Sequence, residues 1–235
     1  MWSLRPAAVR GFADHGWLQA RHSFSFADYH DPEEMGWGAL RVINEDRIAP
    51  GQGFGMHGHR DMEILTWIIA GELEHRDSLG HGGVIRPGEY QRMSAGRGIL
   101  HSEFNPSAVN QTHLLQIWIE PAQRGLPASY EQRVVAPGAL AGGWCLLASP
   151  DARAGSARIH QDARVYAARP EAGAALAMSL GAGRLGYLQV IHGQLSVNGE
   201  IALGPGDGLK LADEPELRLV ASEAAELLFF DLPPA

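Results

Sequence analysis

Residues 51–105 begin GQGFGMHGHRDMEILTWIIAGELEHRDS and end QRMSAGRGILHSEFN. The first part contains His57 and His59, and the second contains His101 and Glu103. Successive side chains of an extended strand point to opposite faces, so a spacing of two places both members of a pair on one face. Two such strands facing each other in a small barrel would offer three imidazoles and one carboxylate to one metal ion.

A solvated polar pair is the alternative interpretation of each motif. An isolated His-x-His in a β protein lies more often on a solvated face than on a metal. Here a His-x-Glu pair follows after a turn-rich interval, as two neighbouring strands of one sheet require. Glycines precede both pairs and allow the backbone to bend or to approach closely beside a site. The joint pattern therefore favours a metal site.

Longer sequence motifs surround the four candidate ligands. Gly51 and Glu63 accompany the first pair, and Gly98 and Asn105 flank the second. This spacing resembles the two motifs of the cupin superfamily. The words HGWLQARHSFSFADYHDP, LRVINEDRIAPGQGF, HGHRDMEILTW, EHRDSLG and MSAGRGILHSEFNPS resemble, more closely, the pirin family with its bacterial quercetinase-like members. The match is dense over about residues 10–125 and weakens beyond them.

The resemblance implies an all-β fold of two tandem cupin barrels, each a double-stranded β-helix, which together form a bicupin. It also implies that the metal lies in the N-terminal barrel and that its ligands are His57, His59, His101 and Glu103. A glutamate at the place of Glu63 is a ligand in many other cupins. Pirin-like proteins take their carboxylate from the second motif, so we expect Glu63 to lie behind the ligands or to be structural.

A segment rich in glycine and proline near residue 130 separates two parts of different composition, because the part that follows has more alanine and glycine and fewer aromatic residues. We expect an N-terminal metal-binding cupin domain over residues 1–130. Residues 131–235 are expected to form a C-terminal cupin-like domain without metal ligands.

The second half of the chain repeats the first in outline. Residues 193–195 (GQL) correspond to residues 71–73 (GEL), and residues 205–207 (PGD) correspond to residues 87–89 (PGE). This is an internal duplication. No His-x-His or His-x-Glu occurs after residue 113, so we expect the second barrel to be structural.

The composition argues against several classes of function. The 235 residues carry a formal charge of -8 and are 45% hydrophobic. Phosphate binding needs clustered Lys and Arg, so we expect no nucleic-acid partner and no anionic membrane surface. The first residues lack the apolar core of a signal peptide, and no apolar run approaches the ~20 residues of a membrane span. We expect a cytoplasmic protein, and a monomer because two barrels can cover each other's apolar faces.

Local patterns predict strands nearly throughout, and only ASYEQR (128–133) and the EAAEL region (223–227) look helical. Some side chains near the ligands are expected either to line a pocket or to pack as ordinary core: Phe54, Met56, Met93, Phe104 and Trp118. The histidines of the first segment lack ligand spacing and are expected to be buried or hydrogen-bonded in loops: His15, His22 and His30.

Three imidazoles and a carboxylate leave one or two metal positions free, which is the arrangement of a catalytic site. We expect one divalent transition metal, Fe(II) first, with Ni, Co, Mn, Cu or Zn as alternatives. The resemblance implies quercetin 2,3-dioxygenase activity, in which O2 opens the central ring of a flavonol and carbon monoxide is released. The partners would be a small flavonol-like aromatic substrate and O2, and Glu103 would act as ligand and base.

Two other functions stay open at this point. The chain also resembles the pirins of animal cells, which are iron-bearing partners of transcription regulators. It would then be a non-enzymatic iron-binding pirin that acts as a redox-responsive partner of a regulatory protein. Alternatively the metal is purely structural, in which case a chelator would lower the melting temperature.

Overall fold

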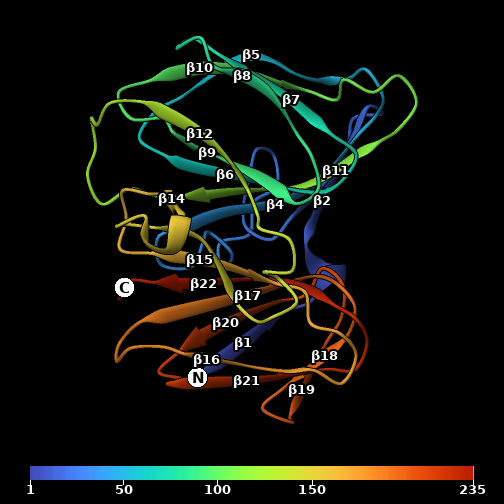
Figure 1. The fold of residues 1–235 in the computed structure, drawn as a ribbon, viewed down its shortest axis with the longest axis vertical. Helices are drawn as coiled ribbons and strands as arrows, with labels where there is room; N and C mark the ends of the chain where they lie inside the picture. Colours follow the sequence, from blue (N-terminus) through green and yellow to red (C-terminus); the bar gives the residue numbers. More distant parts are fainter. Residues whose placement is uncertain (235) are drawn as a thin grey trace.

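Two β-barrels lie one above the other in the computed structural model, which describes residues 1–234 (Figure 1). Each barrel combines a seven-stranded sheet with a four-stranded sheet. The N-terminal barrel is blue to green in Figure 1, and the C-terminal barrel is orange to red. The all-β bicupin predicted from the sequence is confirmed.

The N-terminal barrel has a simple strand order. Its seven-stranded sheet runs β12 (Ser129–Val134), β9 (Glu89–Ser94), β6 (Glu63–Ala70), β11 (Thr112–Ile119), β4 (Leu40–Ile48), β3 (Leu18–His22) and β2 (Gly11–Asp14). Its four-stranded sheet runs β5 (Gly53–His59), β10 (Ile99–Phe104), β7 (Leu73–Asp77) and β8 (Gly82–Ile85).

The C-terminal barrel repeats that order except at one edge, where the last strand pairs in parallel with its neighbour. Its seven-stranded sheet runs β1 (Trp2–Arg5), β20 (Gly208–Ala212), β17 (Leu185–His192), β22 (Glu226–Leu232), β15 (Arg164–Ala168), β13 (Cys145–Ser149) and β14 (Ala157–Arg158). Its four-stranded sheet runs β16 (Ala175–Ser179), β21 (Glu216–Ala221), β18 (Leu195–Val197) and β19 (Ile201–Leu203). The turns at Gly71 and Gly193, both with positive φ, occupy equivalent places in the two barrels.

One edge strand of the C-terminal barrel comes from the N-terminus of the chain. β1, at the N-terminus, pairs with β20 of the C-terminal barrel, and its blue ribbon lies in the lower half of Figure 1. β12 runs across residue 130, where the sequence suggests a domain boundary, and pairs with β9 of the N-terminal barrel. The chain therefore passes between the barrels twice.

Two segments expected to be locally helical are extended instead. The ASYEQR segment forms most of β12, and the EAAEL segment leads through a bend into β22. Pairing with β9 and with β15 and β17 supplies backbone partners that a short isolated helix would lack. Helical structure is confined, within residues 1–234, to two 3₁₀ turns at 7–9 and 153–155. None of the described helices is long and apolar enough to cross a membrane.

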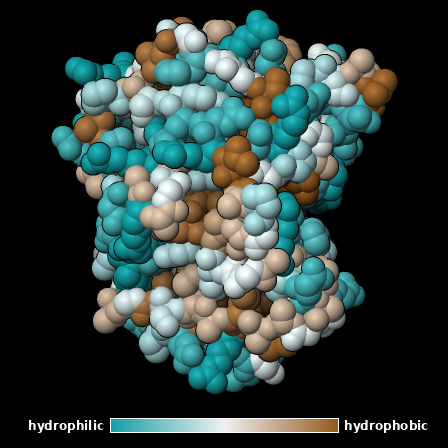
Figure 2. Space-filling model, in the orientation of Figure 1, coloured by the Kyte–Doolittle hydropathy of each residue, from teal (hydrophilic) through white to brown (hydrophobic). Residues whose placement is uncertain are grey.

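The outer faces of the two large sheets pack against each other and form the largest hydrophobic core. Leu65, Trp67 and Ile117 of the N-terminal barrel meet Tyr187 and Phe230 of the C-terminal barrel in this core, all at most 2% exposed. Burial of each such side chain contributes roughly 1.5–3 kcal/mol. On the face drawn in Figure 2, hydrophobic residues reach the surface near the narrowing between the barrels.

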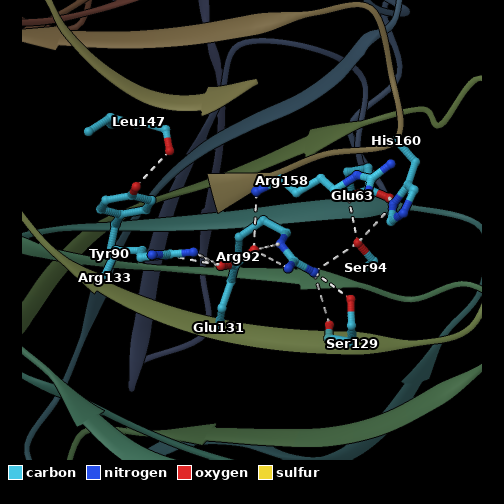
Figure 3. A network of polar contacts seen from close by, with 10 residues as sticks. All are labelled: Glu63, Tyr90, Arg92, Ser94, Ser129, Glu131, Arg133, Leu147, Arg158 and His160. Atoms are coloured by element: carbon cyan, nitrogen blue, oxygen red, sulfur yellow. Dashed lines mark hydrogen bonds and ion pairs between the residues drawn. The ribbon is translucent and has the colours of Figure 1, made fainter. Parts of the chain in front are cut away.

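Polar contacts also cross this interface. The Tyr90 hydroxyl donates to the Leu147 carbonyl at 2.6 Å, and the Trp67 indole N–H donates to Glu226 at 2.7 Å. At one edge, Arg92 binds Ser94, Ser129 and Glu131, and the backbone N–H of Arg158 donates to Glu131 (Figure 3).

Glu63 lies in the same interface between the barrels. Its carboxylate accepts from the Ser94 hydroxyl at 2.7 Å and lies 3.1 Å from the ring of His160, a residue of the C-terminal half (Figure 3). It is 2% exposed. Glu63 was expected either to lie behind the metal ligands or to be structural, and these contacts give it a structural role between the barrels.

Candidate metal centre

The three candidate histidines come together on neighbouring strands. His57 and His59 lie on β5, His101 lies on β10, and His57 is directly opposite His101 in the antiparallel pairing. Ring centroids are 4.8 Å apart for His57 and His59, 4.4 Å for His57 and His101, and 4.9 Å for His59 and His101. One nitrogen from each ring lies within 4.8 Å of the others, a spacing that one ion can bridge.

Glu103 joins the group from the same strand as His101. The register of β10 against β5 shifts between His101 and Glu103, as it does at a β-bulge, which re-aims a side chain. Gly53 makes the close approach possible, because a Cβ at that position would lie 2.2 Å from the Glu103 carbonyl oxygen. The Glu103 carboxylate, His101 and His75 form a second group within 4.8 Å, which shares His101 with the first.

His59 and His101 are held in the neutral form that metal binding needs. Burial lowers the pKa of His59 to about 4, and burial with the neighbouring histidines lowers the pKa of His101 to about 3. Nδ1 of His57 lies 2.8 Å from the Gly55 carbonyl oxygen. If that nitrogen donates its proton, as the carbonyl requires, Nε2 of His57 keeps a free lone pair.

The surroundings of His101 show whether these residues fit a metal. It is 1% exposed, and neither of its ring nitrogens has a hydrogen-bond partner among residues 1–234. Buried nitrogens without a partner cost free energy unless another group satisfies them. Coordination of an ion would satisfy one of them, so the donor set fits a divalent transition metal.

A row of polar side chains supports Glu103 from the opposite sheet. Gln91 donates to its Oε1 at 2.5 Å, and Gln116 donates to its Oε2 at 2.8 Å. Thr66 lies between the two amides and is hydrogen-bonded to both. Burial nevertheless raises the pKa of Glu103 to about 7. Each carboxylate oxygen keeps a further lone pair for a metal or a proton.

The same row continues beyond Gln116, and sequence reasoning missed it. Asn44 is the cross-strand partner of Gln116, and His22 is the partner of Asn44, with Nδ1 of His22 2.8 Å from Oδ1 of Asn44. Asp46, two residues further along β4, is 5% exposed. Burial, with the charges of Glu103 and Glu45, raises its pKa to about 7.

A cavity of about 720 Å³ opens between the two sheets and reaches the candidate ligands His57, His59 and Glu103. Its walls include Trp17, Phe26, Tyr29, Phe54 and Trp118. The pocket expected from the sequence is thus lined by Phe54 and Trp118, whereas Met93 packs in a core and Met56 is 60% exposed. Of the three histidines considered structural, His15 and His22 line the cavity.

His75, on β7, is a further neighbour that no sequence motif indicated. Its ring stacks on Tyr130 at 4.3 Å, lies 5.4 Å from His101, and has Nε2 3.3 Å from Asp77. Burial lowers its pKa. Its spacing of two from Asp77 on one strand is a signal that could have identified it.

Comparison with known proteins assigns this chain to a family. The pirin family model matches residues 4–119, and the model of the quercetinase C-terminal cupin domain matches residues 146–232. The chain is 46% identical to a protein of Escherichia coli K12 named quercetin 2,3-dioxygenase, over 98% of each chain.

Solved structures agree with this assignment. The structure of the bacterial pirin YhhW from Escherichia coli in complex with nickel(II) superposes with a TM-score of 0.95, at 46% identity and over 100% of both chains. A second structure of YhhW gives a TM-score of 0.96, over 100% of this chain and 99% of that one. This chain therefore belongs to the pirin family of the cupin superfamily.

Proposed function

We propose that the chain is a metal-dependent dioxygenase of the quercetin 2,3-dioxygenase type, which opens the central ring of a flavonol with O2 and releases carbon monoxide. The observation that carries this proposal is that His57, His59 and Glu103 line a cavity of about 720 Å³ with aromatic walls, and that His101 lies beside them. Such a cavity suits a small, flat aromatic molecule. The full-length similarity to a relative named for this reaction supports the same assignment.

The proposed ligand set is His57, His59, His101 and Glu103, and the proposed metal is Fe(II). Three imidazoles and one carboxylate suit Fe(II), but also Ni, Co, Mn, Cu and Zn, and the similar pirin YhhW was solved with nickel(II). When bound, such an ion supplies a Lewis acid that polarises a substrate oxygen.

The residues of this chain would handle the substrate proton and its position. Glu103 lines the cavity and would accept the proton of the flavonol 3-hydroxyl. Gln91 and Gln116 hold both of its oxygens in place during this transfer. Trp118, 4.9 Å from the His59 ring, would orient the flat rings beside the metal and exclude water.

The experiment is turnover of quercetin under air by protein loaded separately with Fe(II), Ni(II), Co(II) or Mn(II). Loss of the visible absorption of quercetin and release of carbon monoxide are expected with at least one metal. Glu103→Gln should abolish turnover while the protein stays folded. His192→Ala, in the C-terminal barrel, is the matched control and should leave the rate unchanged. Full activity in a metal-stripped sample would contradict the proposal.

A regulatory role is the second candidate, and one observation favours it. Met56 and Leu100, on the same two strands as the histidines, are 60% and 50% exposed. A protein partner docked there would lie directly against the strands that hold the candidate ligands. Absence of turnover with every metal would favour this role. A monomeric state and a cytoplasmic location accompany both proposals as predictions from the sequence.

A further inference from the structure

The cavity has a polar region away from the candidate metal ligands, formed by His22, Asn44 and Asp46. Strands in a sheet are about 4.8 Å apart. Asn44 and His22 therefore lie about 5 and about 10 Å across the sheet from Gln116, which binds Glu103. We call these three residues the distal polar group.

Aromatic rings connect the candidate metal ligands with the distal polar group. The ring of His59 lies 4.9 Å from that of Trp118, Trp118 lies 5.4 Å from Phe26, and Phe26 lies 5.4 Å from His22. All four rings line the cavity. A flat ligand lying along this wall would have one edge at the candidate metal and the other at the distal polar group.

Asp46 is the member of the group that lacks a partner. Its Oδ1 is buried and has no hydrogen-bond partner within the described part of the chain. Its cross-strand neighbours are Ala20 and Leu114, which offer no polar side chain. A buried carboxyl group left without a partner lowers the stability of a fold. Asp46 lines the cavity, so a ligand hydroxyl there would give its carboxylate a hydrogen-bond partner.

We propose that Asp46, assisted by Asn44 and His22, binds a phenolic hydroxyl on the substrate ring farther from the metal and so selects polyhydroxylated aromatic substrates. This inference rests on the proposed function, because it assumes that a flavonol-like molecule occupies the cavity. A site built to bind a hydroxyl discriminates strongly against an analogue that lacks it, because its own polar groups are then left unpaired.

The test compares the binding of two flavonols to the full-length, nickel-loaded protein without O2, followed by quenching of tryptophan fluorescence. Quercetin carries hydroxyls on both outer rings, whereas 3-hydroxyflavone carries only the 3-hydroxyl. Wild-type protein should prefer quercetin by about tenfold or more. Asp46→Leu should reduce this preference to within about threefold, and Asp46→Ala should do the same if the leucine variant folds poorly. Glu223→Leu, at an exposed carboxylate outside the cavity, is the matched control and should keep the preference.

Thermal unfolding separates recognition from a structural role. Removal of an unpaired buried carboxyl should leave the melting temperature of the Asp46→Leu variant unchanged or raise it, whereas a structural role for Asp46 would lower it. If both flavonols bind but the preference survives in Asp46→Leu, the role of Asp46 is wrong and the dioxygenase proposal stands. If neither flavonol binds nor is turned over, both proposals fall.

Discussion

The two barrels share their strand order except at one edge, but the inner face of one large sheet carries a polar row where the other is apolar. Across the large sheet of the N-terminal barrel, five cross-strand neighbours on the inner face are polar: Gln91, Thr66, Gln116, Asn44 and His22. Across the large sheet of the C-terminal barrel, the corresponding strands carry Leu209, Leu188, Phe229 and Tyr166. The fold requires only that side chains alternate between the two faces of each sheet. The inner face can therefore carry either a polar or an apolar row.

The small sheets differ in the same way. β16 and β21 occupy the places of β5 and β10, and their inward side chains are Leu176, Met178, Leu217 and Leu219. The C-terminal barrel therefore lacks both the donors and the polar row opposite them. The donors also need the polar row opposite them, because a buried carboxylate without hydrogen-bond donors would be too costly.

The strongest way to break this comparison is Leu219→Glu, which places a carboxylate in the C-terminal barrel without any polar row. Leu219 is 2% exposed in a core with Leu188 and Phe229. We expect the free energy of unfolding to fall by about 3–5 kcal/mol in urea titrations. Leu219→Met, a volume-conserving control, should cost less than about 1.5 kcal/mol. Equal midpoints for the glutamate variant and wild type would show that the second interior tolerates charge.

Removal of a candidate ligand tests whether the N-terminal barrel holds the metal. His101→Ala should weaken metal binding by at least about 100-fold, because loss of a ligand should exceed the 10- to 100-fold cost of losing a supporting residue. Elemental analysis and competition with a chelator measure this loss. His192→Ala should leave the metal content at its wild-type value, since His192 lies on β17 of the C-terminal barrel. A metal content that responds equally to both variants would contradict the assignment to one barrel.

The pH dependence of the metal-free protein should also come from the N-terminal barrel. Burial raises the pKa of Glu103 from 4.5 to about 7, so its contribution to stability is complete below pH 4.5 and is lost as the pH rises through 7. Between pH 5 and pH 8, the free energy of unfolding of wild type should therefore fall relative to Glu103→Gln by about 1–3 kcal/mol. Urea titrations at the two pH values measure it, and parallel pH profiles would show that Glu103 titrates normally.

The smallest predicted effect concerns the contact between the barrels. Tyr90→Phe removes the hydrogen bond to the Leu147 carbonyl but keeps the ring in the shared core. The expected loss is about 1 kcal/mol in the free energy of unfolding, with a single transition retained. Tyr166→Phe, whose ring packs partly buried against the core of the C-terminal barrel, is the control and should have little effect. Two separate transitions would show that the barrels unfold independently.

The candidate ligands and the duplication could be predicted because both are local patterns. His57-x-His59 and His101-x-Glu103 are each read within three residues, and the repeated turns stand at equivalent places in the two halves. The polar row could not be predicted in this way, since each of its members is a single residue on a different strand. Only the pairing of five strands brings these residues into line.

The pairing of β1 with the C-terminal barrel and the burial of Asp46 beside the site could not be predicted for related reasons. The residues of β1 form a strand that could pair with either sheet, and nothing local selects β20. In ASYEQR, the glutamate and glutamine favour a helix, but pairing with β9 outweighs that preference. Asp46 has no spacing that separates it from an ordinary surface aspartate, so its burial is visible only in three dimensions.

The positions of β1 and β12 limit how the gene can be divided. A fragment that starts after β1 would leave β20 with an unpaired backbone edge, and unpaired edges recruit strands from other molecules. A fragment that stops before β12 would do the same to β9. Expression of the C-terminal half without β1, or of an N-terminal half that stops before β12, should therefore yield aggregation unless the missing strand is added back as a peptide or grafted on by circular permutation.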